Sequence, residues 1–148
     1  MNMPVVELCD DEACQELEGF LVERIYQFNA RVTGYFDGRL LAGRMRSEAG
    51  EIIAAFNGHT WGGCCVLAHL WVHEGQRGRG LGRALLQAAE TEATHRGCEQ
   101  VVLSTHSFQA PTFYERFGYE KRAVIGGQPK GHANIVYVKR LDGQYGTY

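Results

Sequence analysis

Glycine and arginine alternate in one short segment of the chain, Arg77-Gly78-Arg79-Gly80-Leu81-Gly82, which follows an apolar run and precedes a helical pattern. Glycines let backbone N–H groups approach an anion closely, and a helix N-terminus adds about half a positive charge at the same place. The neighbouring arginines can form charge-assisted hydrogen bonds. We therefore interpret the segment as a phosphate site, with an ordinary tight turn as the alternative.

Two well-known phosphate-binding motifs do not fit this segment. A Walker loop has Lys followed by Ser or Thr after its last glycine, and no such pair follows Gly80 or Gly82. A dinucleotide-binding fingerprint needs a third glycine where Arg83 or Leu85 stands. The sequence therefore disfavours both a nucleotide triphosphatase and a dinucleotide-dependent enzyme.

A second segment, Ser107-Phe108-Gln109-Ala110-Pro111-Thr112-Phe113-Tyr114-Glu115-Arg116-Phe117-Gly118-Tyr119, carries a further motif. It is similar to the signature N-x-x-A-x-x-x-Y-x-x-x-G-[F/Y] of GNAT acetyltransferases, with Ser107 where Asn is usual. The other family signature, [R/Q]-x-x-G-x-[G/A], is matched by Arg77, Gly80 and Gly82. One predicted helix and one predicted strand separate the two segments, as in the family. The chain therefore resembles the GNAT superfamily of N-acetyltransferases.

The resemblance is strongest over residues 60–125, and it implies a cofactor site. Acetyl-coenzyme A is expected between the strand ending at Val72 and the strand Val101–Thr105, where diverging strands leave backbone groups free for its amides. A fully paired core strand is the alternative. The residues implied to contact the cofactor are Leu70, Trp71, Val72, Arg77, Gly78, Arg79, Gly80, Leu81, Gly82, Arg83, Ser107, Ala110 and Tyr114.

The resemblance also implies roles in acyl transfer. Tyr114 matches the family tyrosine near the cofactor sulfur and is the candidate general acid for the leaving thiolate, while a backbone N–H near Val72 is a candidate for stabilising the oxyanion. His69 is the first candidate for the general base, because imidazole can accept a proton near neutral pH. A hydrogen-bonded core histidine is the alternative interpretation of His69. The other candidates for the base are His59, His106, Glu74, Glu115 and an ordered water.

Two further kinds of chemistry are disfavoured. His69 and His73 would stand about 13 Å apart on a strand, and no H-E-x-x-H motif surrounds them, so we expect no metal site. Cys64 and Cys65 begin the same strand and are expected to act as small apolar residues, not as nucleophiles.

The composition narrows the class of protein. The chain has 148 residues, with 15 Lys and Arg against 17 Asp and Glu, and a net charge of -2 disfavours a nucleic-acid partner. Its five cysteines form no C-x-x-C pair and are expected to be free thiols of a cytoplasmic protein. The sequence indicates neither a signal peptide nor a membrane span, so no membrane partner is expected.

The hydrophobic periodicity predicts one α/β domain over residues 1–148. Helices are expected to begin near Asp10, Gly80 and Ala110, and the first should end before Gly34. The predicted strands are Val5–Cys9, Arg39–Arg46, Glu51–His59, Cys65–Val72, Val101–Thr105, Lys121–Ile125 and Ile135–Arg140. Cys65–Val72, almost wholly apolar, is expected to be central and covered on both faces. With the resemblance, this order predicts a GNAT fold, a twisted mixed sheet of six to seven strands flanked by helices on both faces.

The expected function is transfer of an acetyl group from acetyl-CoA to a primary amine of a small molecule, by direct attack in a ternary complex. The alternatives are a CoA-binding regulatory domain and an acyltransferase for protein lysines or aminoacyl-tRNA. Family resemblance alone suggests a homodimer. The resemblance implies that Phe28, Tyr35, Phe56 and Trp61 come from elements that line the acceptor site, although most of them are expected to be core residues. The loop Gly126–His132 is a further candidate, with an ordinary hairpin connection as the alternative.

Overall fold

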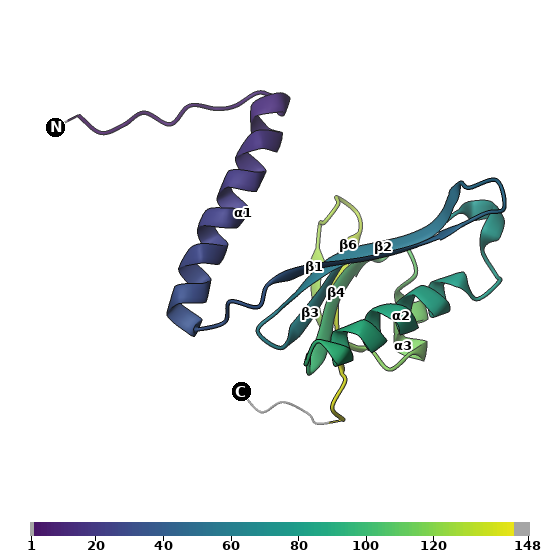
Figure 1. Ribbon diagram of the computed structural model, residues 1–148. Coiled ribbons are helices and arrows are strands. Elements are labelled where there is room, and N and C mark those ends of the chain that lie inside the picture. Colours follow the sequence, from purple (N-terminus) through teal and green to yellow (C-terminus); the bar gives the residue numbers. More distant parts are fainter. Residues whose placement is uncertain (1, 144–148) are drawn as a thin grey trace. The chain divides into compact units, whose positions relative to one another are not determined.

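The computed structural model of the chain describes residues 2–143, and Figure 1 shows their course. The chain forms two compact units that divide between Phe36 and Asp37. The first unit contains α1 (Asp11–Thr33), and the second contains a β-sheet with α2 (Leu81–His95) and α3 (Pro111–Arg116). That the whole chain is one domain stays a prediction.

Helix α1 begins and ends where the sequence predicts. Asp10 caps its start, since Oδ1 of Asp10 accepts a hydrogen bond from the Ala13 N–H at 2.9 Å. Gly34 ends it with φ 78°. The predicted strand at Val5–Cys9 is wrong, because the described residues of this unit include no second strand to accept its backbone hydrogen bonds. No helix within residues 2–143 combines the length and the apolar character needed to cross a membrane.

Six strands form the sheet of the second unit, in the order β1-β2-β3-β4-β6-β5. Their bounds are β1 (Arg39–Arg46), β2 (Ile52–Trp61), β3 (Cys64–Val72), β4 (Gln100–His106), β5 (Glu120–Gly126) and β6 (Ala133–Arg140). All neighbours are antiparallel except β3 and β4. Helix α2 connects these two, since a parallel pair needs a crossover. The predicted mixed α/β class is confirmed.

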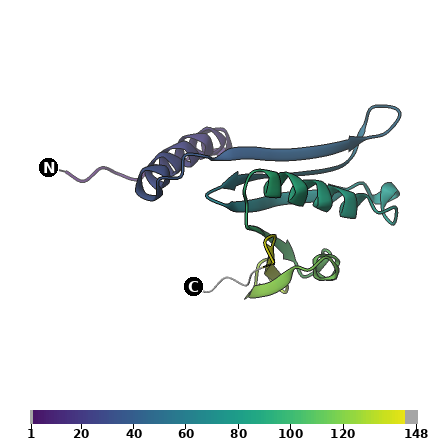
Figure 2. The same ribbon diagram turned by 60° about the horizontal axis from the view of Figure 1, so that its bottom comes forward.

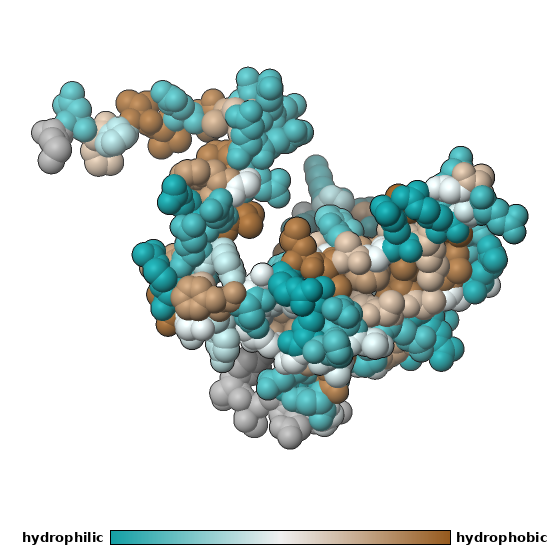
Figure 3. Space-filling model, in the orientation of Figure 1, coloured by the Kyte–Doolittle hydropathy of each residue, from teal (hydrophilic) through white to brown (hydrophobic). Residues whose placement is uncertain are grey.

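The hairpin between β1 and β2 also follows the prediction. The Ser47 N–H donates to the Glu51 carbonyl at 2.8 Å, and Gly50 takes φ 85°, a left-handed value that favours glycine. Figure 3 shows hydrophilic residues gathered at this end of the hairpin. Local turn chemistry therefore fixes the start of β2.

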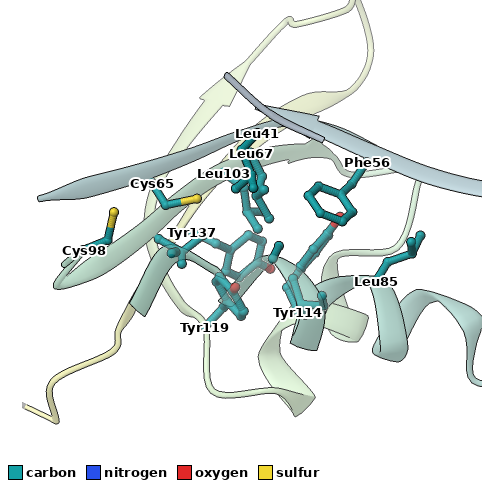
Figure 4. Close-up of a cluster of buried hydrophobic side chains, with 14 of the residues drawn as sticks. Leu41, Phe56, Cys65, Leu67, Leu85, Cys98, Leu103, Tyr114, Tyr119 and Tyr137 are labelled. Atoms are coloured by element: carbon teal, nitrogen blue, oxygen red, sulfur yellow. The ribbon is translucent and has the colours of Figure 1, made fainter. Parts of the chain in front are cut away.

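One apolar cluster joins the helices of the second unit to the sheet. Helix α2 contacts β1, β2 and β3 and lies along them in Figure 2. Its residues Leu85, Leu86, Ala89 and Ala93 are buried and form a cluster with strand residues and with Tyr114 of α3, as Figure 4 shows in close-up. Burial of this stripe holds α2, and therefore its first turn, in a fixed position on the sheet.

Polar contacts add to this attachment of α2. At its end, Arg96 donates to the Leu40 carbonyl and to the Thr60 hydroxyl, each at 3.1 Å. Lys139 of β6 forms an ion pair with Glu90 of α2. The helix is thereby tied to strands on both sides of the β3–β4 pair.

Candidate active site

A β-bulge on the central strand β3 determines which way His69 faces. Gly58 of β2 stands opposite Leu67, whereas Asn57 stands opposite His69, so Ala68 is an extra residue on β3. Side chains alternate along a strand, and Leu67 faces the core. Without the extra residue His69 would face the core as well, because a one-residue slip reverses every side chain. The bulge places His69 on the other side of the sheet.

His69 is consequently an exposed residue with a side-chain partner. Its Nδ1 lies 2.9 Å from Oδ1 of Asn57 on β2. The strand is central, as predicted, but within the second unit the expected cover on both faces is wrong: Cys65 and Leu67 are buried, whereas His69 and Trp71 are exposed. The interpretation of His69 as a core histidine is therefore also wrong.

Strands β3 and β4 are paired over only part of their length. The parallel register joins Cys64–Leu67 to Gln100–Leu103, and within residues 2–143 no pairing of the two strands follows. The His73 N–H donates to a β2 carbonyl at 2.7 Å. Because N–H groups alternate in direction along a strand, those of Leu70 and Val72 point toward the β4 side. This part of β3 can therefore offer backbone groups to a ligand, which a fully paired strand could not.

The glycine-rich segment follows a short 3₁₀ helix, η1 (Glu74–Gln76), and ends in the first turn of α2. Gly78 and Gly80 take φ of 81° and 80°, and a Cβ on either would meet nothing within 4 Å. Open space therefore lies over this backbone. Gly80 is the N-cap of α2 and provides no side-chain cap, which leaves the first N–H groups of the helix for an anion. The geometry fits a phosphate site.

The three arginines of this region have different surroundings. The Nε of Arg77 donates to the carbonyl of the last β3 residue at 3.3 Å, which holds the loop against the end of that strand. Arg79 donates to the side-chain oxygen of Gln76, and Arg83 lies over the ring of Phe117, 5.8 Å from its centroid. A guanidinium has five N–H donors, so these contacts leave donors for a phosphate.

Tyr114 lies in the buried cluster next to the start of α2. Gly82 permits this packing, because a Cβ there would lie only 3.2 Å from Cζ of Phe113, the neighbour of Tyr114. Figure 4 shows the Tyr114 side chain reaching from α3 toward Phe56 on β2. Burial raises the pKa of the Tyr114 hydroxyl above its ordinary value, so the hydroxyl keeps its proton at neutral pH.

His69 and Tyr114 lie on opposite sides of β3. Tyr114 belongs to the cluster that contains Leu67, whereas the bulge turns His69 to the other side of the strand. The diverging part of β3 lies between them. A reacting group held along Leu70 and Val72 would therefore have a base candidate on one side and an acid candidate on the other.

Ser107 joins the end of β4 to the start of β6. Its N–H donates to the Ala133 carbonyl at 2.8 Å, and its Oγ accepts from the Ala133 N–H at 3.0 Å. Phe108 follows, stacked on His106 at 5.2 Å and in edge contact with His132 at 4.9 Å between ring centroids. The predicted acceptor loop thus contacts the segment that follows β4, while cofactor contacts of Ser107 and of Ala110, the N-cap of α3, stay predictions.

The remaining candidates for the acceptor site are distributed over both units. Phe56 is only 6% exposed and belongs to the core, which is the alternative expected for most of these aromatics. Leu81 packs against the same core, and Trp61 is half-buried at the end of β2. Phe28 and Tyr35 belong to the first unit.

The other candidates for the base differ from His69 in their contacts. Glu115 accepts a hydrogen bond from the Tyr137 hydroxyl at 3.2 Å. His106 is stacked on an aromatic ring, and Glu74 begins η1. His59 stands two residues from Asn57 on β2. His69 alone among these candidates occupies the diverging part of β3.

Nucleophilic thiols are not indicated by the structure. Burial, with smaller effects of Cys98 and Cys64, raises the pKa of the Cys65 thiol to about 12. A thiol that keeps its proton at neutral pH is a poor nucleophile. The cysteines are free, and residues 2–143 contain no group of three or more His, Cys, Asp or Glu side chains that could hold a metal ion.

Comparison with known proteins identifies the family. The sequence profile described as the acetyltransferase (GNAT) family matches residues 5–119, well over half of the chain. The chain belongs to the GNAT acetyltransferase family. This confirms the resemblance carried by the two segments.

Known acetyltransferases resemble the chain in sequence and in structure. Blasticidin-S acetyltransferase of Streptomyces morookaense is 39% identical over 95 residues, which are 64% of this chain and 70% of that protein. Acetyltransferase Atu2258 of Agrobacterium fabrum is 31% identical over 141 residues, covering 95% of this chain and all of that protein. The crystal structure of an acetyltransferase from Bacillus cereus has a TM-score of 0.76 at 27% identity, covering 95% of this chain and 99% of that one. The predicted GNAT fold is confirmed.

Two residues of the site are not indicated by the sequence motifs. Asn57 contacts His69 from the neighbouring strand, and its only signal is a polar side chain in a largely apolar run. Phe113 packs on Gly82 and so links α3 to α2. Both contacts join segments that are distant in sequence, which a contiguous motif does not describe.

Proposed function

We propose that this GNAT protein transfers an acetyl group from acetyl-CoA to a primary amine of a small molecule, by direct attack in a ternary complex. The observation that carries the proposal is the divergence of β3 and β4, with the glycine-rich segment at its end and Tyr114 and His69 on its two sides. A cytoplasmic location, a homodimer and the lack of nucleic-acid and membrane partners stay predictions from the sequence.

The residues present fit coenzyme A. Over Gly78 and Gly80 there is room for a pyrophosphate, next to arginine donors and the start of α2. The N–H groups of Leu70 and Val72 are directed to the side where pantetheine amides would replace the missing strand. When bound, acetyl-CoA would supply the acetyl group as a reactive thioester.

Each stage of acyl transfer has a candidate residue in this arrangement. The Val72 N–H would stabilise negative charge on the carbonyl oxygen. His69 would take a proton from the attacking amine on one side of β3. Tyr114, whose pKa burial raises, would give its proton to the departing sulfur on the other side.

A CoA-binding regulatory domain without turnover is the second candidate. The observation behind it is the cofactor site itself, since the open glycine-rich loop and the unpaired part of β3 would bind CoA whether or not an amine is acetylated. An acyltransferase for protein lysines or aminoacyl-tRNA has less support, because a net charge of -2 offers no broad basic surface.

A release assay separates the first two candidates. CoA release from acetyl-CoA would be measured with a panel of amines that includes blasticidin S, because a relative of this chain is named for it. We expect at least one amine to release CoA well above the rate without amine. If CoA binds but no amine exceeds that background, the binding-domain function is correct.

Gly80 provides the sharper test of the cofactor site. Gly80→Asp places a carboxylate in the open space over the loop and should weaken CoA binding by at least about a hundredfold, because the pyrophosphate is anionic. Gly80→Asn is the matched control, since Asn tolerates a positive φ and adds no charge. Calorimetry should show much tighter binding for the Asn variant than for the Asp variant. Equal affinity of Gly80→Asp and the unaltered protein would show that the phosphate site lies elsewhere.

A further inference from the structure

His69 has a partner on the neighbouring strand that fixes one of its two ring nitrogens. Its Nδ1 lies 2.9 Å from Oδ1 of Asn57, and the two residues stand directly opposite each other in the β2–β3 register. Both side chains have few rotatable bonds, so little side-chain conformational entropy is lost when they form this contact. The opposite ring nitrogen, Nε2, points away from Asn57.

The backbone around the pair holds this contact in place. Gly58 follows Asn57, and a Cβ at Gly58 would lie 2.0 Å from the Val66 carbonyl oxygen. Only glycine therefore lets β2 approach β3 this closely beside the extra residue Ala68. The close approach and the bulge together bring Asn57 opposite His69 and not opposite a core residue.

We propose that Asn57 is a positioning residue for His69, an inference that rests on the proposed function. The Asn57 Oδ1 accepts the Nδ1–H of His69, which leaves the lone pair on Nε2. One proton moves, from the attacking amine nitrogen to Nε2. Nδ1 keeps its own proton throughout, so the same hydrogen bond stabilises the ring before and after the transfer. In the opposite tautomer, which carries its proton on Nε2, the Nδ1 lone pair would face the lone pairs of Asn57 Oδ1 and be repelled by them.

Few other titratable groups of β1 to β4 stand near the pair of Asn57 and His69. His59 follows Asn57 by two residues on β2, and Arg44 of β1 stands opposite Ala55, diagonal to Asn57. On β3 itself, Trp71 and then His73 follow, and His106 lies on the far side of the divergence, on β4. Apart from these histidines, Arg44 is the one charged group that the register of β1 to β4 places near the pair.

The test is the pH dependence of kcat/KM in variants at position 57. Asn57→Asp keeps an acceptor at the same place and adds a negative charge, which favours the protonated ring. The base must be neutral, so the acid limb of the profile should move to higher pH by about one unit, with Arg44 limiting the shift. Asn57→Leu removes the acceptor, so kcat should fall about fivefold and the limb should move to lower pH.

Three controls make the outcome specific. Gln87→Glu makes the same amide-to-carboxylate change at an exposed position of α2 and should leave the limb in place. His69→Gln should remove the limb, both alone and combined with Asn57→Asp. Thermal unfolding of each variant shows whether the change acts through stability instead.

Different results would refute the proposed function and the role of Asn57. If no amine releases CoA from the unaltered protein, the proposed function is wrong. If the protein is active but Asn57→Asp lowers activity without moving the acid limb, Asn57 has only a structural role and the inference is overturned. Movement of the limb to higher pH in Asn57→Leu would also overturn it, because the amide would then have been donating to Nδ1 and stabilising the neutral ring.

Discussion

At the scale of single residues, burial extends the pH range over which Tyr114 keeps its proton. Its side chain is only 9% exposed and packs among apolar and aromatic groups. Removal from water disfavours the charged phenolate, which raises the pKa. A general acid must carry its proton when the leaving group departs. Tyr114 therefore meets this requirement throughout the neutral range and into the alkaline range.

Tyr114→Phe tests this role directly. The ring and its packing stay, whereas the acidic proton is lost, so kcat should fall about ten- to a thousandfold with little change in CoA affinity. Steady-state kinetics and calorimetry measure the two quantities. Tyr119→Phe makes the same change at a neighbouring buried tyrosine and should leave kcat unaltered. An unchanged kcat in Tyr114→Phe would remove the assigned acid.

At the scale of elements, the sequence predicts what local chemistry determines. Asp10 and Gly34 delimit α1, and the glycine-rich segment leads into α2, because caps and turns depend on a few adjacent residues. The prediction of a strand at Val5–Cys9 is wrong because the apolar pattern of one segment does not identify a strand with which it could pair. Pairing is a property of two segments, and one segment alone cannot establish it.

The bulge on β3 is the part of the site that the sequence could not reveal. The strand is almost wholly apolar, so the extra residue Ala68 does not change its composition, and no alternation of polar and apolar residues marks the bulge. It nevertheless reverses the side on which His69 and Trp71 lie. The contact between His69 and Asn57 depends on that register, so it emerges only from the paired strands.

Gly58→Ala tests the bulge. Its Cβ would lie 2.0 Å from the Val66 carbonyl oxygen, and separating the strands to relieve this clash should lower the free energy of unfolding by about 2 to 3 kcal/mol. Urea unfolding measures the loss. Gly19→Ala on α1, where a Cβ meets nothing within 4 Å, is the control and should stabilise the helix by roughly 0.5 to 1 kcal/mol. Equal stability of Gly58→Ala and the unaltered protein would contradict the close approach of β2 and β3.

At the scale of the whole molecule, the sheet unit buries several groups that titrate above neutral pH. Burial raises the pKa of Tyr114, of Tyr119, of Tyr137 and, to about 12, of Cys65. The unfolded chain ionises its cysteines and tyrosines at about 8.5 and 10. The folded protein keeps these protons to higher pH. Stability from these groups is thus complete below about pH 8.5 and should decline as the pH rises beyond it.

The contribution of Tyr119 to this loss of stability at high pH can be measured separately. Its hydroxyl is buried and has no hydrogen-bond partner in the described part of the chain, so Tyr119→Phe removes an unsatisfied polar atom and should stabilise the protein by about 1 kcal/mol at pH 7. Above about pH 10 the unfolded variant has one proton fewer to lose, and its advantage should grow by about 1.4 kcal/mol per pH unit. Urea unfolding of both proteins at pH 7, 9, 10 and 10.5 measures the difference. Parallel pH profiles would mean that Tyr119 ionises as readily in the folded sheet as in the unfolded chain, which its burial beside Glu90 and Tyr114 opposes.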